Sequence, residues 1–132
     1  MKKGKLVFCY GTLRLNHGNY RGRIEPYILR GEAKHVGKIC TEPKFTMHGK
    51  RASFPAVTLN GETAIVGDLF EIESEECLKG LDYLEGHYGK DNPKNFYNTT
   101  EIETEHGPAT MYILDNVRDE NNVINSGDWE NR

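Results

Sequence analysis

The chain of 132 residues has few cysteines, no histidine pair at metal-ligand spacing and no large excess of charge of one sign. Each absence excludes a class of protein. Its three cysteines, Cys9, Cys40 and Cys77, are an odd number at wide spacings, so they predict neither a disulfide framework nor a C-x-x-C site. The five histidines include no H-x-x-x-H pair and no neighbouring cysteine cluster, so we expect no metal site.

Long apolar runs are also missing, since no stretch approaches the roughly 18 residues of a membrane helix. The start of the chain has no signal-type cleavage pattern, so we expect a cytoplasmic protein with no membrane contact. Lys and Arg number 17 against 20 Asp and Glu, with the signs interspersed, which disfavours a nucleic-acid partner. The length predicts one domain, residues 1–114, followed by a polar and loosely held tail, residues 115–132, packed on it or extending from it.

Several apolar segments predict strands, and one segment predicts a helix. Strands are expected at residues 5–10, 32–40, 56–59, 63–72, 96–104 and 109–114. Asn60-Gly61 is a type I′ turn signal, which predicts a hairpin between residues 56–59 and 63–72. The latter strand is apolar on both faces and should be central. Ser74 as N-cap and Gly86 as terminator bound a helix from about residue 75 to 85. The pattern favours an α+β fold on a mostly antiparallel, perhaps closed, sheet.

Glu85 breaks the amphipathic pattern of the predicted helix. At roughly 100° per residue, its side chain falls on the apolar arc between Leu78 and Leu81, whereas the other acids fall toward solvent. A carboxylate facing apolar surroundings has a raised pKa and can act as a general base or acid near neutral pH. Alternatively, the last helical turn lets this carboxylate reach water or pair with a nearby Lys or Arg.

The segment Tyr10-Gly11-Thr12-Leu13 follows a buried strand and enters a glycine turn. Backbone N–H groups that leave a sheet in this way can hold a carboxylate or an oxyanion. A plain turn is the alternative interpretation. Cys9 lies inside the apolar strand with no basic neighbour in sequence, which is typical of inert packing.

Together these segments resemble the gamma-glutamylcyclotransferase-like superfamily, in its small gamma-glutamylamine cyclotransferase-like branch. The resemblance covers about residues 5–114 and rests on Y-G-T-L at 10–13, Asn19, Phe54-Pro55-Ala56, G-D-L-F-E-I at 67–72, L-D-Y-L-E-G at 81–86, Phe96-Tyr97 and Met111-Tyr112. It implies a small β-barrel with flanking helices and a pocket at the loop of residues 10–13. It also implies no cofactor and a monomer or small homo-oligomer.

The resemblance further implies an intramolecular reaction of a small γ-glutamyl compound, which releases 5-oxoproline and a free amine. Glu85 would be the catalytic acid and base, the substrate would contact Tyr10, Gly11, Thr12 and Leu13, and Tyr97 and Tyr112 would reach it with their hydroxyls. The chain departs from the family at Thr99, where a basic residue often follows the late-strand tyrosine. A non-catalytic module that sequesters a small ligand in the same pocket is therefore the alternative.

Overall fold

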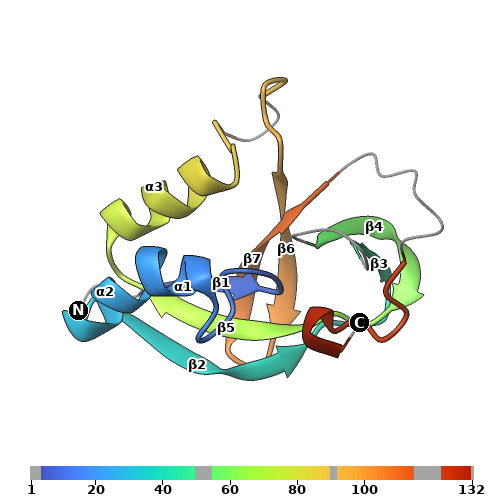
Figure 1. Ribbon diagram of the computed structural model, residues 1–132, viewed down its shortest axis with the longest axis horizontal. Helices are drawn as coiled ribbons and strands as arrows, with labels where there is room; N and C mark the ends of the chain where they lie inside the picture. The colour runs from blue at the N-terminus through green and yellow to red at the C-terminus, as the bar shows by residue number, and fades with distance from the viewer. Residues whose placement is uncertain (1–3, 50–54, 90–91, 115–122, 132) are drawn as a thin grey trace.

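The strands form one five-stranded sheet and one two-stranded sheet in a computed structural model that describes residues 4–49, 55–89, 92–114 and 123–131 (Figure 1). The larger sheet has the order β2-β5-β1-β7-β6, and β1 and β7 are its parallel pair. The strands are β1 (Lys5–Cys9), β2 (Ala33–Cys40), β3 (Phe45–His48), β4 (Ala56–Thr63), β5 (Val66–Ile72), β6 (Asn98–Thr104) and β7 (Gly107–Ile113). The predicted α+β class with a mostly antiparallel sheet is confirmed.

The larger sheet is apolar on both faces, and each face has its own cover. Alternate side chains of the central strands point to opposite faces, so Leu69 and Phe70 of β5 join different clusters. The helices α1 (Gly18–Arg23), α2 (Glu25–Leu29) and α3 (Glu75–Leu84) cover the Phe70 face, and β3 and β4 cover the Leu69 face (Figure 1). The prediction of a central strand that is buried on both sides is confirmed. The strand begins at Val66 rather than at residue 63, where it was predicted to begin.

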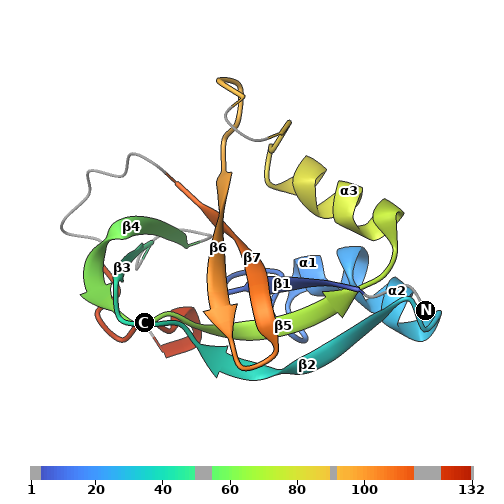
Figure 2. The same cartoon turned by 180° about the vertical axis from the view of Figure 1, so that it is seen from behind.

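The sheet is strongly twisted, so that β6 and β7 cross the direction of β2 and β5 (Figure 2). Backbone hydrogen bonds outside the strands link the two sheets: the Leu114 N–H donates to the Val57 carbonyl at 3.0 Å. The described strands form no closed barrel, and barrel closure stays a prediction. Within the described ranges, no helix has the length and apolar character needed to cross a membrane.

The helix expected near residues 75–85 is confirmed as α3, whose N-cap Ser74 accepts a hydrogen bond from the Cys77 N–H. The helices α1 and α2 were not predicted as such. Their six and five residues are too few to show a helical period, and α2 carries a proline in its first turn. Their place is set by tertiary packing, because Tyr20 and Ile24 are buried against the sheet.

The predicted hairpin at Asn60-Gly61 is wrong. The strand β4 continues through both residues and pairs with β3, whereas β5 pairs with β1 and β2. A bulge in β4 brings Gly61 against the Phe45 carbonyl, where a Cβ atom would collide with that oxygen. The glycine is therefore needed for close backbone approach rather than for a type I′ turn.

Residues 123–131 end in the short 3₁₀ helix η2 (Trp129–Asn131) and are packed more firmly than the polar composition suggests. Ile124 is 2% and Trp129 6% exposed, and both belong to the core between the two sheets. Their apolar side chains anchor a segment that is otherwise polar. The remainder of the predicted tail, residues 115–122, and Phe54 lie outside the described residues.

Candidate active site

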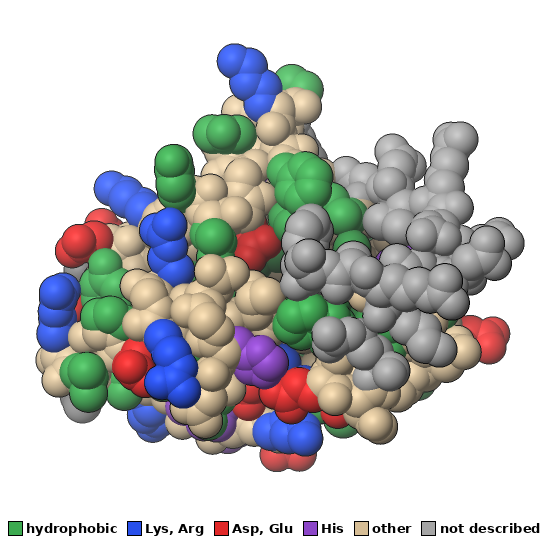
Figure 3. Space-filling model, in the orientation of Figure 1, with side chains coloured by type: hydrophobic (Ala, Val, Ile, Leu, Met, Phe, Trp, Pro, Cys, Tyr) green, Lys and Arg blue, Asp and Glu red, His purple; other side chains and the backbone are tan. Residues whose placement is uncertain are grey.

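A pocket of about 390 Å³ opens between the loop after β1, the end of α3 and the strands β6 and β7. The structure brings to it all seven predicted site residues: Tyr10, Gly11, Thr12, Leu13, Glu85, Tyr97 and Tyr112. The other lining residues are Phe8, Cys9, Asn19, Pro55, Leu84 and Phe96. Hydrophobic side chains gather over the place where the end of α3 meets β6 and β7 (Figure 3). Among these lining residues, Glu85 is the single carboxylate.

Glu85 is placed by the way in which α3 ends. It is the C-cap, and the following Gly86 adopts a left-handed conformation with φ of 62°. The N–H of His87 then donates to the Asp82 carbonyl at 2.8 Å, which closes a Schellman motif. The N–H of Tyr97 donates to the Glu85 carbonyl at 3.2 Å. The end of the helix and the start of the β6–β7 hairpin are thereby joined at the catalytic candidate.

The Glu85 carboxylate is withdrawn from water. Burial raises its pKa from 4.5 to about 7. Its side chain makes no hydrogen bond or ion pair with another described residue, so the alternative of pairing with a nearby Lys or Arg is not realised there. A carboxyl group with a pKa near neutrality can accept a proton in one step and return it in the next.

Three tyrosines line the pocket together with Glu85, and the hydroxyl of each donates to an acceptor in the protein. Tyr10 donates to the Tyr112 carbonyl at 2.7 Å, Tyr97 to the Pro55 carbonyl at 3.0 Å, and Tyr112 to Asp82 Oδ1 at 2.6 Å. Burial raises the pKa of all three phenols, and the negative charge of Glu85 adds to this effect. The phenols therefore stay neutral, and their oxygens can offer lone pairs to a ligand.

The loop after β1 presents backbone donors to the pocket. The N–H groups of Gly11, Thr12 and Leu13 donate to no acceptor within the described part of the chain. The carbonyl of Thr12 accepts from the Tyr20 N–H at 3.2 Å, and its hydroxyl accepts from the Asn19 amide, which fixes the loop against α1. Three unpaired N–H groups in succession can bind an anion. The Arg14 N–H donates to the Gly11 carbonyl at 3.0 Å, so residues 11–14 also form the turn of the alternative interpretation, and the N–H groups that this turn leaves without a described acceptor are available to a carboxylate or an oxyanion.

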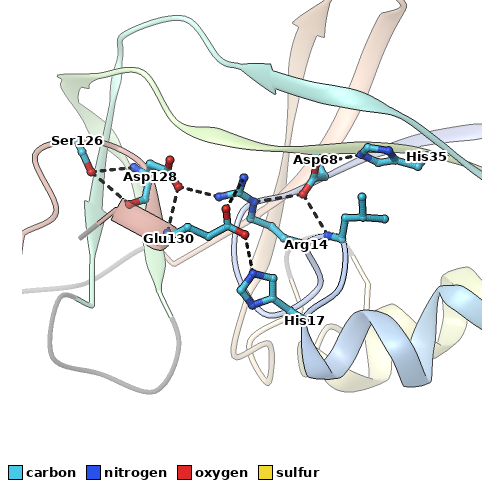
Figure 4. A network of polar contacts seen from close by, with 8 residues as sticks. Arg14, His17, His35, Asp68, Ser126, Asp128 and Glu130 are labelled. Atoms are coloured by element: carbon cyan, nitrogen blue, oxygen red, sulfur yellow. Dashed lines mark hydrogen bonds and ion pairs between the residues drawn. The ribbon is translucent and has the colours of Figure 1, made fainter.

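A buried ion network holds this loop from behind. The Arg14 side chain, 2% exposed, lies between Asp68 of β5 on one side and Asp128 and Glu130 of the C-terminal segment on the other (Figure 4). Its three contacts are Nε to Asp68 at 3.2 Å, Nη1 to Asp128 at 2.8 Å and Nη2 to Glu130 at 3.3 Å. Asp68 also accepts a hydrogen bond from the Leu15 N–H. The Arg14 side chain and the Leu15 backbone, which follow the loop, are therefore both bound to β5.

Sequence reasoning missed this network, although one signal was available. Asp68 is an acid in a central strand that is apolar on both faces apart from Glu71, and a buried acid needs a partner. Nothing local points to Asp128 or Glu130 as further partners of Arg14, because they lie more than a hundred positions away.

The other reactive groups near the pocket are poor candidates for chemistry. Burial, together with the charges of Glu85 and Asp68, raises the pKa of the Cys9 thiol well above its usual value. This thiol is therefore not a nucleophile at neutral pH. Among the residues that the structure describes, no three His, Cys, Asp or Glu side chains are grouped to hold a metal ion.

Comparisons with known proteins identify the family of this chain. The model of the family described as gamma-glutamyl cyclotransferase, AIG2-like, matches residues 7–131. A Vibrio cholerae protein that carries the name gamma-glutamylcyclotransferase is 31% identical over 124 residues, which span 94% of each chain. The gamma-L-glutamyl-butirosin B gamma-glutamyl cyclotransferase of Niallia circulans is 27% identical over 94% of this chain and 74% of its own.

Solved structures share the fold. An AIG2-like protein from Mus musculus has a TM-score of 0.64 at 19% identity and covers 91% of this chain and 82% of its own. A protein from Pyrococcus horikoshii has a TM-score of 0.67 at 20% identity, with 96% and 90% covered. At these identities, the structures support the fold alone. Because the family model matches residues 7–131, nearly the whole length of this chain, the chain belongs to the gamma-glutamyl cyclotransferase, AIG2-like family of enzymes.

Proposed function

We propose that this protein cyclises a small γ-glutamyl amine, with release of 5-oxoproline and the free amine. The observation that carries the proposal is the half-buried Glu85 carboxyl, with a pKa of about 7, in one pocket with the N–H groups of residues 11–13, which have no acceptor in the described part of the chain. The Niallia circulans relative is named for γ-L-glutamyl-butirosin B, a γ-glutamyl compound, which supports a γ-glutamyl substrate here.

The reaction needs a base, an anion site and an acid. Glu85 takes a proton from the α-ammonium group, and the freed amine attacks the γ-carbonyl carbon of the same molecule, where a C–N bond forms. The carbonyl oxygen becomes an oxyanion. Glu85 then gives its proton to the leaving nitrogen, the older C–N bond breaks, and the carbonyl of 5-oxoproline is restored. The ring nitrogen also loses its second proton, which the released amine takes up, so that it leaves as an ammonium ion. No proton is gained or lost by Glu85 over the cycle.

The remaining pocket residues would bind and orient the substrate. The N–H groups of Gly11, Thr12 and Leu13 would hold the glutamyl carboxylate or the oxyanion. The rings of Tyr10 and Tyr97 would keep the glutamyl chain folded, so that amine and carbonyl meet within one molecule. A volume of about 390 Å³ is at the lower end of the range for small-ligand pockets, about 300–1,000 Å³, which favours a small amine half.

The test compares the wild type with Glu85→Gln, which keeps the shape of the protonated acid but cannot exchange a proton. Both are incubated with γ-glutamyl amines, γ-glutamyl amino acids and glutathione, and 5-oxoproline is quantified by mass spectrometry. Glu101→Gln, the same change at an exposed position of β6, is the control and should keep wild-type turnover. Wild-type turnover by Glu85→Gln would contradict this mechanism.

Calorimetry with the same compounds separates catalysis from sequestration. Glu85→Gln should bind the best substrate, since the loop and the tyrosines are intact. The departure at Thr99 favours the sequestering module as the second candidate, and that module predicts a ligand recovered unchanged from the wild type. A cytoplasmic location and a monomeric or small oligomeric state stay predictions, and size-exclusion chromatography with light scattering tests the latter.

A further inference from the structure

Asp82 is the acid of the L-D-Y-L-E-G segment that the proposed mechanism leaves unused. It lies on α3 three positions before Glu85, and its Oδ1 accepts a hydrogen bond from the Tyr112 hydroxyl at 2.6 Å. A distance this short is typical of a hydroxyl bound to an ionised carboxylate. Tyr112 is 7% exposed and Asp82 is half-buried, so this contact is partly buried.

Asp82 and Glu85 face different cavities, and Tyr112 borders both. The 390 Å³ pocket is lined by Glu85 and Tyr112, whereas a second cavity of about 110 Å³ is lined by Asp82 and Tyr112. Asp82 is absent from the lining of the larger pocket. Asp82 therefore does not line the surface that a substrate would contact there, and its hydrogen bond with the Tyr112 hydroxyl connects it to that surface.

The chemistry of this pair fixes the direction of the hydrogen bond. A phenol has one O–H donor and two acceptor lone pairs, and an ionised carboxylate can only accept. The Tyr112 proton therefore points to Asp82, and the lone pairs are left for other donors. The hydroxyl is near enough to Glu85 for its negative charge to raise the Tyr112 pKa further. Tyr112 and Glu85 also line the same 390 Å³ pocket, so a ligand bound there can contact both residues.

We propose that Asp82 is a positioning residue, which holds the Tyr112 hydroxyl so that its oxygen accepts a hydrogen bond from the α-ammonium group of the γ-glutamyl substrate. This inference rests on the proposed function. An ammonium group has three N–H donors, and Glu85 is the one carboxylate lining the pocket, so a second acceptor beside it meets a real need. The Tyr112 carbonyl, which accepts from Tyr10, ties a second pocket wall to the same residue.

Asp82→Asn and Tyr112→Phe test the inference. In Asp82→Asn the amide can donate to the phenol oxygen, so the hydroxyl loses its fixed direction; in Tyr112→Phe the acceptor is gone. Each should raise KM about 10- to 100-fold, the range for a lost hydrogen bond to a charged group. The effect on kcat should be smaller, since the ammonium is bound before it reacts. The acidic limb of the pH profile should not move, because burial alone raises the Glu85 pKa.

The double variant Asp82→Asn/Tyr112→Phe tests whether Asp82 changes KM through the Tyr112 hydroxyl. Because Asp82 acts through the Tyr112 hydroxyl, Asp82→Asn should add nothing in a Tyr112→Phe background. Glu75→Gln, an acid-to-amide change at an exposed position of the same helix, is the control and should keep wild-type KM and kcat. Circular dichroism and thermal unfolding establish that each variant is folded.

The results separate this inference from the proposed function. Wild-type KM in Asp82→Asn, or a further KM increase in the double variant over Tyr112→Phe, would overturn the positioning role while cyclisation stands. If the wild type forms no 5-oxoproline, calorimetry with γ-L-glutamylethylamide decides: weaker binding by Asp82→Asn than by wild type supports the role, and equal binding overturns it. A wild type that neither converts nor binds any compound of the panel refutes both proposals.

Discussion

Glu85→Gln is expected to stabilise the folded protein above pH 7 and to change its stability little near pH 5. Burial raises the Glu85 pKa from 4.5 to about 7 in the folded state. Between these values the folded protein keeps a proton that the unfolded chain has lost, so the wild-type free energy of unfolding falls as pH rises. One such proton corresponds to about 1.4 kcal/mol per pH unit, hence about 3 kcal/mol over the whole window. Glutamine cannot ionise, so the free energy of unfolding of the variant does not fall with pH for this reason.

Urea unfolding of wild type and Glu85→Gln between about pH 5 and pH 9 measures the effect, provided that unfolding is two-state. The difference in free energy of unfolding should grow in favour of the variant up to about pH 7 and then level off. Glu101→Gln, exposed on β6, should follow the wild type throughout. A difference between Glu85→Gln and wild type that stays constant over this range would show that Glu85 is not desolvated, and the electrostatic argument for its role would fail. No substrate is needed for this measurement.

Three other predictions concern the same site and its supports. The pH profile of kcat/KM should have an acidic limb with its midpoint near pH 7, set by Glu85 in the free enzyme. Arg14→Met should lower the free energy of unfolding by about 3–5 kcal/mol, whereas Lys44→Met, at an exposed ion pair, should cost under about 1 kcal/mol in urea titrations. Gly86→Ala, at a φ of 62°, should cost about 1–2 kcal/mol, and Gly22→Ala in α1 should be neutral or slightly stabilising by the same assay.

The features that the sequence predicted well are those encoded over short stretches. The helix α3 shows its period, its Ser74 cap and its Gly86 terminator within thirteen residues, and the same wheel marks Glu85 as the acid on the buried side. The loop of residues 10–13 follows an apolar strand directly, so its place at the end of that strand could be predicted. These two local signals account for six of the thirteen residues that line the pocket, including the one carboxylate among them.

The features that the sequence did not predict depend on distant partners. Asn60-Gly61 has the local signature of a tight turn, but the pairing of β4 with β3 overrides it and uses Gly61 for close approach. The ion pairs of Arg14 involve a central strand and the C-terminal segment, and no spacing in the sequence links them. Local propensity is a weak guide wherever tertiary contacts select the conformation.

The two long-range contacts that frame the pocket have a consequence for the order in which the protein becomes functional. The Tyr10 hydroxyl binds a carbonyl 102 positions further along the chain, and Arg14 binds a carboxylate 114 positions away. Ribosomes release the amino-terminal part of a chain first, so the loop that is proposed to bind the substrate is synthesised long before the residues that hold it. Contacts of such separation form late, because a large loop must close before they contribute. A nascent chain that lacks Asp128 and Glu130 would thus hold Arg14 through Asp68 alone, and substrate binding should begin only after translation has passed this segment.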